Sequence, residues 1–292
     1  MIFIQTPQEF SFKEVTRFLS RNEKECLHTI HHNEIFKVLE INNQLTLFSI
    51  VFDKDLIIAI HTPDKSITIQ DNIKQYIIDW FDLTTDLKHF YKDVQKDEVL
   101  QNLCQQYYGL RMIGMPDLFE SLVWSVIGQQ INLNFAYSLK ERLVRNYGRS
   151  IIHNNETFYA LPTPEKLASL NIEDFLPHQF SRSKAQYILN ISRAFAEGNL
   201  IQDEIKKLPF DEIRQKLIAI KGVGNWTANY SMMKSLKSYD AFPIEDVGLH
   251  NAIKNQYKLN GKPTIAELHK MSENWSGWRG YATFYFWHSL LT

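Results

Sequence analysis

Cysteine is scarce in this sequence of 292 residues, and so are long apolar runs. The two cysteines, Cys26 and Cys104, lie far apart, and neither belongs to a C-x-x-C motif. This pattern argues against a disulfide scaffold, a zinc ribbon and a cysteine-ligated iron–sulfur cluster. No apolar run approaches the ~20 residues that cross a bilayer, and the first ten residues lack the basic and apolar regions of a signal peptide. We therefore expect a cytoplasmic protein in a reducing compartment, with no membrane partner.

An excess of charge of either sign is also missing. Lys and Arg total 32 and Asp and Glu total 33, which gives a net charge of −1 and a pI near 6.8. This balance argues against a bulk polyelectrolyte binder of the histone type. It leaves room for a protein that contacts DNA through a local patch and backbone amides. At about 150 residues per domain, the length predicts two domains.

Two kinds of periodicity divide the chain. Between residues 34 and 70, short apolar or alternating runs are separated by turn residues such as Asn42-Asn43, which indicates an antiparallel meander of about four strands. From residue 72 onward, apolar residues recur at helical spacing. We therefore predict an α+β protein, with an N-terminal domain of antiparallel sheet and helices over residues 1–90 and an all-α domain over 91–292. Nothing in the first domain looks catalytic, so we interpret it as structural.

A glycine hairpin, Gly222-Val223-Gly224, joins an apolar helix that ends near Ile220 to a second helix that begins at Asn225. Two glycines two residues apart let the backbone turn tightly and approach a ligand closely. The second helix presents unpaired N–H groups and the positive end of its dipole, which suit a phosphate group. Such a contact positions DNA without reading its sequence. Taken alone, the motif fits an ordinary helix–turn–helix corner better.

Asp246 follows Pro243 and precedes a helix predicted over residues 247–257. Its simplest role is that of an N-cap. The position also has a chemical consequence, because a helix N-terminus favours a charged carboxylate. Such a carboxylate suits the cleavage of an N-glycosidic bond, whose transition state resembles an oxocarbenium ion. Asp246 would stabilise that cation and orient or deprotonate a water molecule.

Aromatic residues are concentrated in the last third of the chain. Aromatic side chains at helical spacing belong to the core more often than to a binding pocket. An aromatic cage is nevertheless suited to a flipped, positively charged alkylated base, through stacking and cation–π attraction. Stacking contributes about 1–3 kcal/mol per base, which is comparable to the cost of unstacking it. The residues concerned are Trp226, Tyr230, Trp275, Trp278, Tyr281, Tyr285, Phe286 and Trp287.

Several ordered motifs together resemble the helix–hairpin–helix DNA glycosylase superfamily, and most of all its 3-methyladenine DNA glycosylase II branch. The central one is I-x-G-V-G-x-W-T-A, followed by D-A-F-P-x-x-D-x-G-L, over residues 220–249. Four further stretches agree in the same order, over residues 81–87, 119–130, 161–165 and 275–287. The resemblance covers residues 81–291, and the segment before it matches the family's N-terminal α/β domain more loosely. Several motifs in order are far more specific than one glycine hairpin.

The resemblance implies roles for the matching residues. Asp246 corresponds to the family's catalytic aspartate. The base pocket is implied to contain Trp226, Tyr230, Trp287 and His288. DNA contact is implied for the hairpin residues Gly222, Val223 and Gly224, for Thr227, and for Gln130 or Ile131. One of the last two would be the wedge that fills the space left by a flipped base.

The resemblance also bears on cofactors. In this family, backbone carbonyl groups of the hairpin often hold a monovalent cation, which here would lie on Gly222 and Gly224. No metal site made of side chains and no other cofactor are expected.

Trp226 occupies the position that holds a Schiff-base lysine in the glycosylase/lyase branches of the family. With no amine there to attack the sugar, we expect a monofunctional glycosylase that acts on damaged double-stranded DNA as a monomer. The expected lesions are cationic alkylated bases, chiefly 3-methyladenine and, as a further candidate, 7-methylguanine. Two alternatives remain: a catalytically silent DNA-binding module, and a glycosylase/lyase that acts on another lesion.

Overall fold

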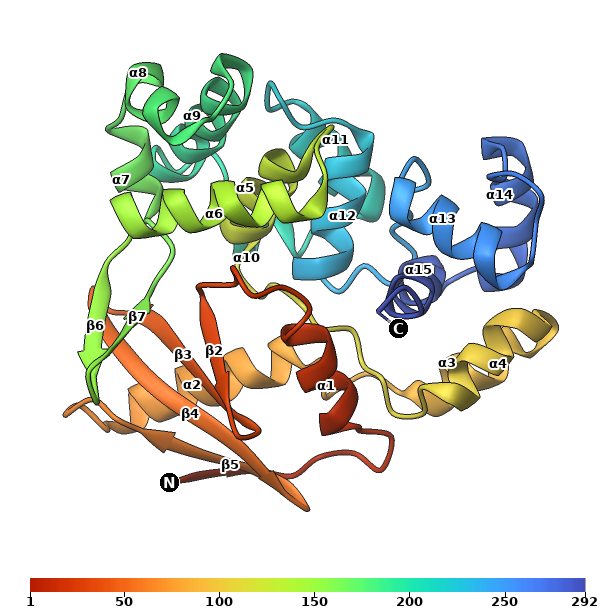
Figure 1. The fold of residues 1–292 in the computed structure, drawn as a ribbon, viewed down its shortest axis with the longest axis horizontal. Helices are drawn as coiled ribbons and strands as arrows, with labels where there is room; N and C mark the ends of the chain where they lie inside the picture. The colour runs from red at the N-terminus through yellow and green to blue at the C-terminus, as the bar shows by residue number, and fades with distance from the viewer. Residues whose placement is uncertain (292) are drawn as a thin grey trace.

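A computed structural model describes residues 1–291 and contains a β-sheet at the N-terminal end and a larger helical body (Figure 1). The sheet has five antiparallel strands in the order β1-β5-β4-β3-β2. These strands are β1 (Ile2–Ile4), β2 (His28–His31), β3 (Glu34–Ile41), β4 (Gln44–Asp53) and β5 (Asp55–Ile60). The predicted meander is confirmed for β2 to β5, although β2 lies before the expected range and β1 adds a fifth strand at the edge.

Asparagine pairs set the hairpins of the sheet. Asn42 and Asn43 both have positive φ angles, of 51° and 62°, and Ile41 pairs directly with Gln44 across them. A two-residue turn with both residues in the left-handed region matches the twist of the strands it joins, and asparagine tolerates that region well. The turn between β2 and β3 has the same geometry at His32 and Asn33.

Two helices pack with the sheet. They are α1 (Phe12–Leu19), whose N-cap Ser11 accepts a hydrogen bond from the Glu14 N–H group, and α2 (Ile67–Trp80), which lies behind the sheet in Figure 1. Their apolar faces are buried, with Val15 and Phe18 among the residues on α1. The C-terminal end of α1 reaches the helical body, and this matters for the site described below.

The helical body contains most of the remaining chain. Its α-helices are α3 (Leu87–Asp93), α4 (Glu98–Gln106), α5 (Leu118–Gly128), α6 (Leu133–Tyr147), α7 (Pro164–Ala168), α8 (Ile172–Phe175), α9 (Arg182–Ala196), α10 (Gln202–Ile205), α11 (Phe210–Ile218), α12 (Asn225–Ser235), α13 (Val247–Gln256), α14 (Ile265–Ser272) and α15 (Arg279–His288). Short 3-10 helices cover Val94–Lys96, Leu176–His178 and Glu273–Trp275. No helix within residues 1–291 is long and apolar enough to span a membrane.

One detail of the all-α prediction is wrong, because a hairpin of strands β6 (Ser150–His153) and β7 (Glu156–Tyr159) interrupts the helices. It extends beside the N-terminal sheet in Figure 1, where Phe158 packs with Val38 and Leu47. Its turn is again an asparagine pair in the left-handed region. The hairpin thus fixes part of the second predicted domain to the first.

The sheet and the helical body share one continuous hydrophobic core and two buried polar contacts. Lys140 on α6 donates to both oxygens of Glu25 at 2.6–2.7 Å. Burial acts to raise the pKa of Glu25, but Lys140, His28 and backbone N–H groups outweigh it and hold the pKa well below its usual range. His288 on α15 lies 2.6 Å from Glu14 on α1. The domain division near residue 90 stays a prediction.

Candidate active site

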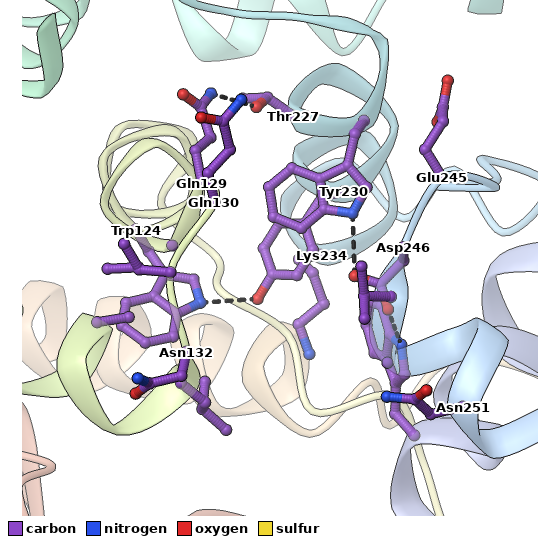
Figure 2. Close-up of a pocket in the computed structure, with 18 of the residues that line it drawn as sticks. Trp124, Gln129, Gln130, Asn132, Thr227, Tyr230, Lys234, Glu245, Asp246 and Asn251 are labelled. Atoms are coloured by element: carbon purple, nitrogen blue, oxygen red, sulfur yellow. Dashed lines mark hydrogen bonds between the residues drawn. The ribbon is translucent and has the colours of Figure 1, made fainter.

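A cleft of about 1190 Å³ opens where helices from distant parts of the sequence meet. Its walls come from α12, from α5 and the loop of residues 128–133, from residues 245–248, and from the end of α15 (Figure 2). Phe18 and Arg21 line it from the end of α1. The cleft therefore combines the two ends of the chain with its middle.

The glycine hairpin lies at one side of the cleft, between α11 and α12. Gly222 has a φ of +109°, and a Cβ atom there would come within 2.3 Å of the Tyr187 ring, so only glycine fits. Gly224 is the N-cap of α12 and has no side chain to occupy the free N–H groups of the helix. The exposed helix N-terminus is therefore available to an anion, as the motif predicts. The Val223 side chain is buried, which leaves only its backbone for the predicted DNA contact.

Gln129, at the end of α5, ties the next loop to the hairpin. Its side-chain amide donates to the carbonyl oxygen of Gly222 and to Oγ1 of Thr227, both at 3.0 Å (Figure 2). Thr227 is 1% exposed, so only its backbone N–H group is available for the predicted contact with DNA. The carbonyl of Gly224 accepts the first hydrogen bond of α12 from Ala228. Each carbonyl accepts one of these hydrogen bonds and keeps a second lone pair, so the monovalent cation site stays a prediction.

The loop after Gln129 holds the two wedge candidates. Gln130 is exposed and has a φ of +56°, whereas Ile131 is half-buried, and both line the cleft. Lys184 on α9 fixes the start of this loop, because its ammonium donates to the carbonyls of Val126, Ile127 and Gln129 at 2.7–2.9 Å. Burial lowers the pKa of Lys184 to about 8. The choice of wedge stays open at this point.

Asp246 is the N-cap of α13 and has three N–H donors. Its Oδ1 accepts from the Leu249 backbone at 2.7 Å and from Trp287 Nε1 at 2.8 Å. Its Oδ2 accepts from Trp226 Nε1 at 3.0 Å. The predicted N-cap is confirmed, and the structure brings this carboxylate together with two of the predicted pocket tryptophans (Figure 2).

Three aromatic residues form one continuous wall of the cleft. The rings of Trp226 and Tyr230 stack with centroids 5.4 Å apart, and Trp287 lies 5.9 Å from Tyr230. Trp124 on α5 donates to the Tyr230 hydroxyl at 3.0 Å from the opposite side. Burial raises the pKa of Tyr230, so the hydroxyl stays neutral. The other aromatic residues noted in the last third of the chain do not line the cleft; these are Trp275, Trp278, Tyr281, Tyr285 and Phe286.

The prediction that His288 belongs to the base pocket is wrong. His288 is fully buried on the other side of α15, where it contacts Glu14 and packs against the Tyr107 ring at 4.8 Å. Consecutive helical residues point about 100° apart, and here that rotation directs His288 away from the cleft that Trp287 lines. Burial lowers the pKa of His288 despite its hydrogen bond to Glu14.

The cleft-lining residues that sequence reasoning missed include Arg21, Trp124, Gln129 and Lys234. Lys234 follows Trp226 and Tyr230 at intervals of four, so helical spacing could have indicated it. Trp124 and Gln129 stand inside a motif that had been assigned no pocket role. Arg21 had no local signal, because it comes from the segment interpreted as purely structural.

Comparison with known proteins agrees with this geometry. Residues 123–277, which are more than half of the chain, match the family model of the HhH-GPD superfamily base excision DNA repair proteins. The chain belongs to the HhH-GPD superfamily. Residues 2–122 match the N-terminal domain of 8-oxoguanine DNA glycosylase. The predicted superfamily and the α+β fold are therefore confirmed.

Related proteins narrow the assignment from the superfamily to an enzyme activity. The chain is 39% identical to DNA-3-methyladenine glycosylase of Bacillus subtilis, over 99% of this chain and 97% of that protein. It is 27% identical to DNA-3-methyladenine glycosylase 2 of Escherichia coli, over 62% and 61% of the two chains. This HhH-GPD protein is therefore a DNA N-glycosylase.

Solved structures agree on the fold. A 3-methyladenine DNA glycosylase from Archaeoglobus fulgidus aligns with a TM-score of 0.85 at 19% identity, covering 98% of this chain and 97% of that one. An 8-oxoguanine glycosylase/lyase from Clostridium acetobutylicum aligns with a TM-score of 0.75 at 19% identity, covering 98% and 95%. The HhH-GPD fold thus occurs in glycosylases with different names, and the lesion has to be argued from the cleft.

Gly248 provides a test of the cleft geometry. A Cβ atom there would lie 2.9 Å from Oδ1 of Asp246 and 3.5 Å from the Trp287 ring, so Gly248→Ala should displace the carboxylate. Because small displacements of reacting groups are costly, we expect base release to slow by about 10-fold or more. The melting temperature should change by less than about 3 °C. Gly261→Ala is the matched control, since a Cβ atom there meets nothing within 4 Å. Unchanged base release by Gly248→Ala would contradict the importance of this geometry.

Proposed function

We propose that this DNA glycosylase is monofunctional and hydrolyses the N-glycosidic bond of alkylated bases in duplex DNA, chiefly 3-methyladenine and also 7-methylguanine. One observation carries the proposal. The Asp246 carboxylate lies in an aromatic cleft and is held there by three N–H donors, two of which belong to the tryptophans that line the same cleft.

Asp246 would act on the sugar carbon that develops positive charge. As the bond between C1′ and the base nitrogen breaks, its electron pair leaves with the base, and a cationic alkylated base becomes neutral. The fixed carboxylate stabilises the oxocarbenium-like sugar, and a water molecule oriented by Asp246 adds to C1′ and loses its proton. Since the three donors already hold the carboxylate in place, little reorganisation is needed during the reaction. No general acid is required for such a leaving group.

The aromatic wall would hold the flipped base. Stacking on Trp226 or Tyr230 contributes about 1–3 kcal/mol for one base, and a positive charge on the base adds cation–π attraction. Damage that weakens the pairing of a base lowers the cost of flipping it. These terms together favour cationic, poorly paired bases over normal ones.

The hairpin and the neighbouring loop would hold the DNA. The N–H groups at the start of α12 suit a phosphate group next to the lesion. We assign the wedge to Gln130, because it is exposed at the turn whereas Ile131 is half-buried. We also propose that the protein works as a monomer, since one chain supplies every residue of the cleft, and that it acts in the cytoplasm.

Asp246→Asn tests the mechanism. Asparagine is as good an N-cap as aspartate, so the fold and DNA binding should be retained. Release of 3-methyladenine from methylated duplex DNA should fall by about 10³-fold, because a neutral amide cannot stabilise the sugar cation in the same way.

Glu204→Gln is the control, since Glu204 on α10 is exposed and does not line the cleft. Full activity of Asp246→Asn would overturn the mechanism. If the unaltered protein bound methylated DNA and released no base, the silent DNA-binding module would be the better account.

Borohydride trapping tests the monofunctional assignment. Trp226 supplies no amine. Lys234 is 4% exposed, and its amine donates to the Ile113 carbonyl. Burial lowers the pKa of Lys234 well below its ordinary value, which would favour a neutral nucleophile, but the same burial withholds it from the sugar. We therefore expect no covalent adduct when borohydride is added during turnover.

A glycosylase/lyase acting on its own substrate serves as the positive control. A trapped adduct that disappears in Lys234→Met would contradict the assignment and identify the nucleophile.

A further inference from the structure

Two basic side chains, Arg21 and Lys234, line the cleft. Within residues 1–291, neither lies within 4.0 Å of a carboxylate oxygen. Cationic groups that line a cavity without an acidic partner are costly unless something compensates them. A ligand that offers a hydrogen-bond acceptor would provide that compensation.

Lys234 is the weaker candidate of the two for contact with a ligand. Its ammonium donates to the Ile113 carbonyl and lies 5.1 Å and 4.7 Å from the ring centroids of Phe18 and Phe284. The residue is 4% exposed. Its charged end is therefore enclosed by protein, and a ligand could reach it only if the aromatic residues moved.

Arg21 differs from Lys234 because it is less buried and its charged group has more N–H donors. It is half-buried, and its guanidinium is anchored over the Phe18 ring at 3.9 Å, with Tyr137 at 5.6 Å. Its NH1 group donates to the Phe18 carbonyl at 2.8 Å, which is its one hydrogen bond within the described part of the chain. A guanidinium has five N–H donors in a rigid plane, so several donors remain for a ligand in the cleft.

We propose that Arg21 is a specificity-determining residue that donates a hydrogen bond to the 6-oxo oxygen of a purine flipped into the cleft. This inference rests on the proposed function above. Arginine donates to O6 and N7 of unmodified guanine. The methyl group of 7-methylguanine occupies N7, so O6 remains as the acceptor, whereas adenine-type bases present an N6 amino donor at the same place. A guanidinium cannot accept a hydrogen bond from that amino group. Arg21 therefore favours 7-methylguanine over 3-methyladenine at the step of base recognition.

The two bases make a sharp comparison because both carry a positive charge. Repulsion between Arg21 and the charge of the base is therefore present for both, and the group at position 6 is what distinguishes them. A ratio of the two excision rates, measured on one sample, also does not depend on the fraction of folded enzyme.

The experiment uses duplex DNA methylated to contain both bases, with enzyme in excess, and follows release of 7-methylguanine and 3-methyladenine over time. The variants are Arg21→Gln and Arg21→Met. We expect the ratio of the two rates, 7-methylguanine over 3-methyladenine, to fall by about 10-fold in each, as for the loss of one base-specific contact. Arg21→Gln should also speed 3-methyladenine release relative to Arg21→Met, because its amide oxygen can accept from the N6 amino group.

Arg17→Gln is the matched control. Arg17 lies on α1, four residues before Arg21, and donates to the Leu291 carbonyl, but it does not line the cleft, so the ratio for this variant should equal that of the unaltered protein. An equal loss for both bases in the Arg21 variants, with a weaker dependence of binding on salt, would mean that Arg21 contacts a phosphate group and would overturn the proposal. An unchanged ratio with unchanged rates would overturn it as well. If the unaltered protein released neither base, the proposed function itself would fail, which is a distinct result.

Discussion

The hydrogen bonding of the Asp246 carboxylate is the constraint on which the rest of the site depends. Its three donors come from the start of α12, the start of α13 and the end of α15. Two of the donors are indoles that also form the aromatic wall. The wall that would hold a base and the carboxylate that would act on its sugar are thus one unit, and neither can shift without the other.

The surroundings of this unit connect it to both ends of the chain. Gln129 joins the loop of residues 128–133 to the glycine hairpin, and Lys184 fixes the start of that loop through three carbonyls. At the other side, α1 brings Arg21 to the cleft, and the buried contact of Glu14 with His288 fixes α1 against α15. The N-terminal region is therefore more than a support, because it completes the cleft.

Features encoded over a few neighbouring residues were predictable from the sequence. The Asp246 N-cap and the Gly222 turn each depend on residues within one helical turn, and both are present. His288 was placed wrongly because proximity in sequence to Trp287 says nothing about which face of α15 it occupies. Arg21 could not be found, since its role depends on packing between segments more than 200 residues apart, which leaves no local pattern. The β6–β7 hairpin was missed although its Asn154-Asn155 turn has the same signature as Asn42-Asn43.

The central claim is that Trp226 and Trp287 have two functions: their indole N–H groups hold the Asp246 carboxylate in place, and their rings line the cleft. Single-turnover base release by Trp226→Phe, Trp287→Phe and the double variant tests it most directly, because phenylalanine keeps an aromatic ring and removes the N–H donor. Each single variant should slow release about 10-fold and the double variant about 100-fold or more, while affinity for methylated DNA changes by less than about 3-fold. Release by the double variant at the rate of the unaltered protein would contradict the account.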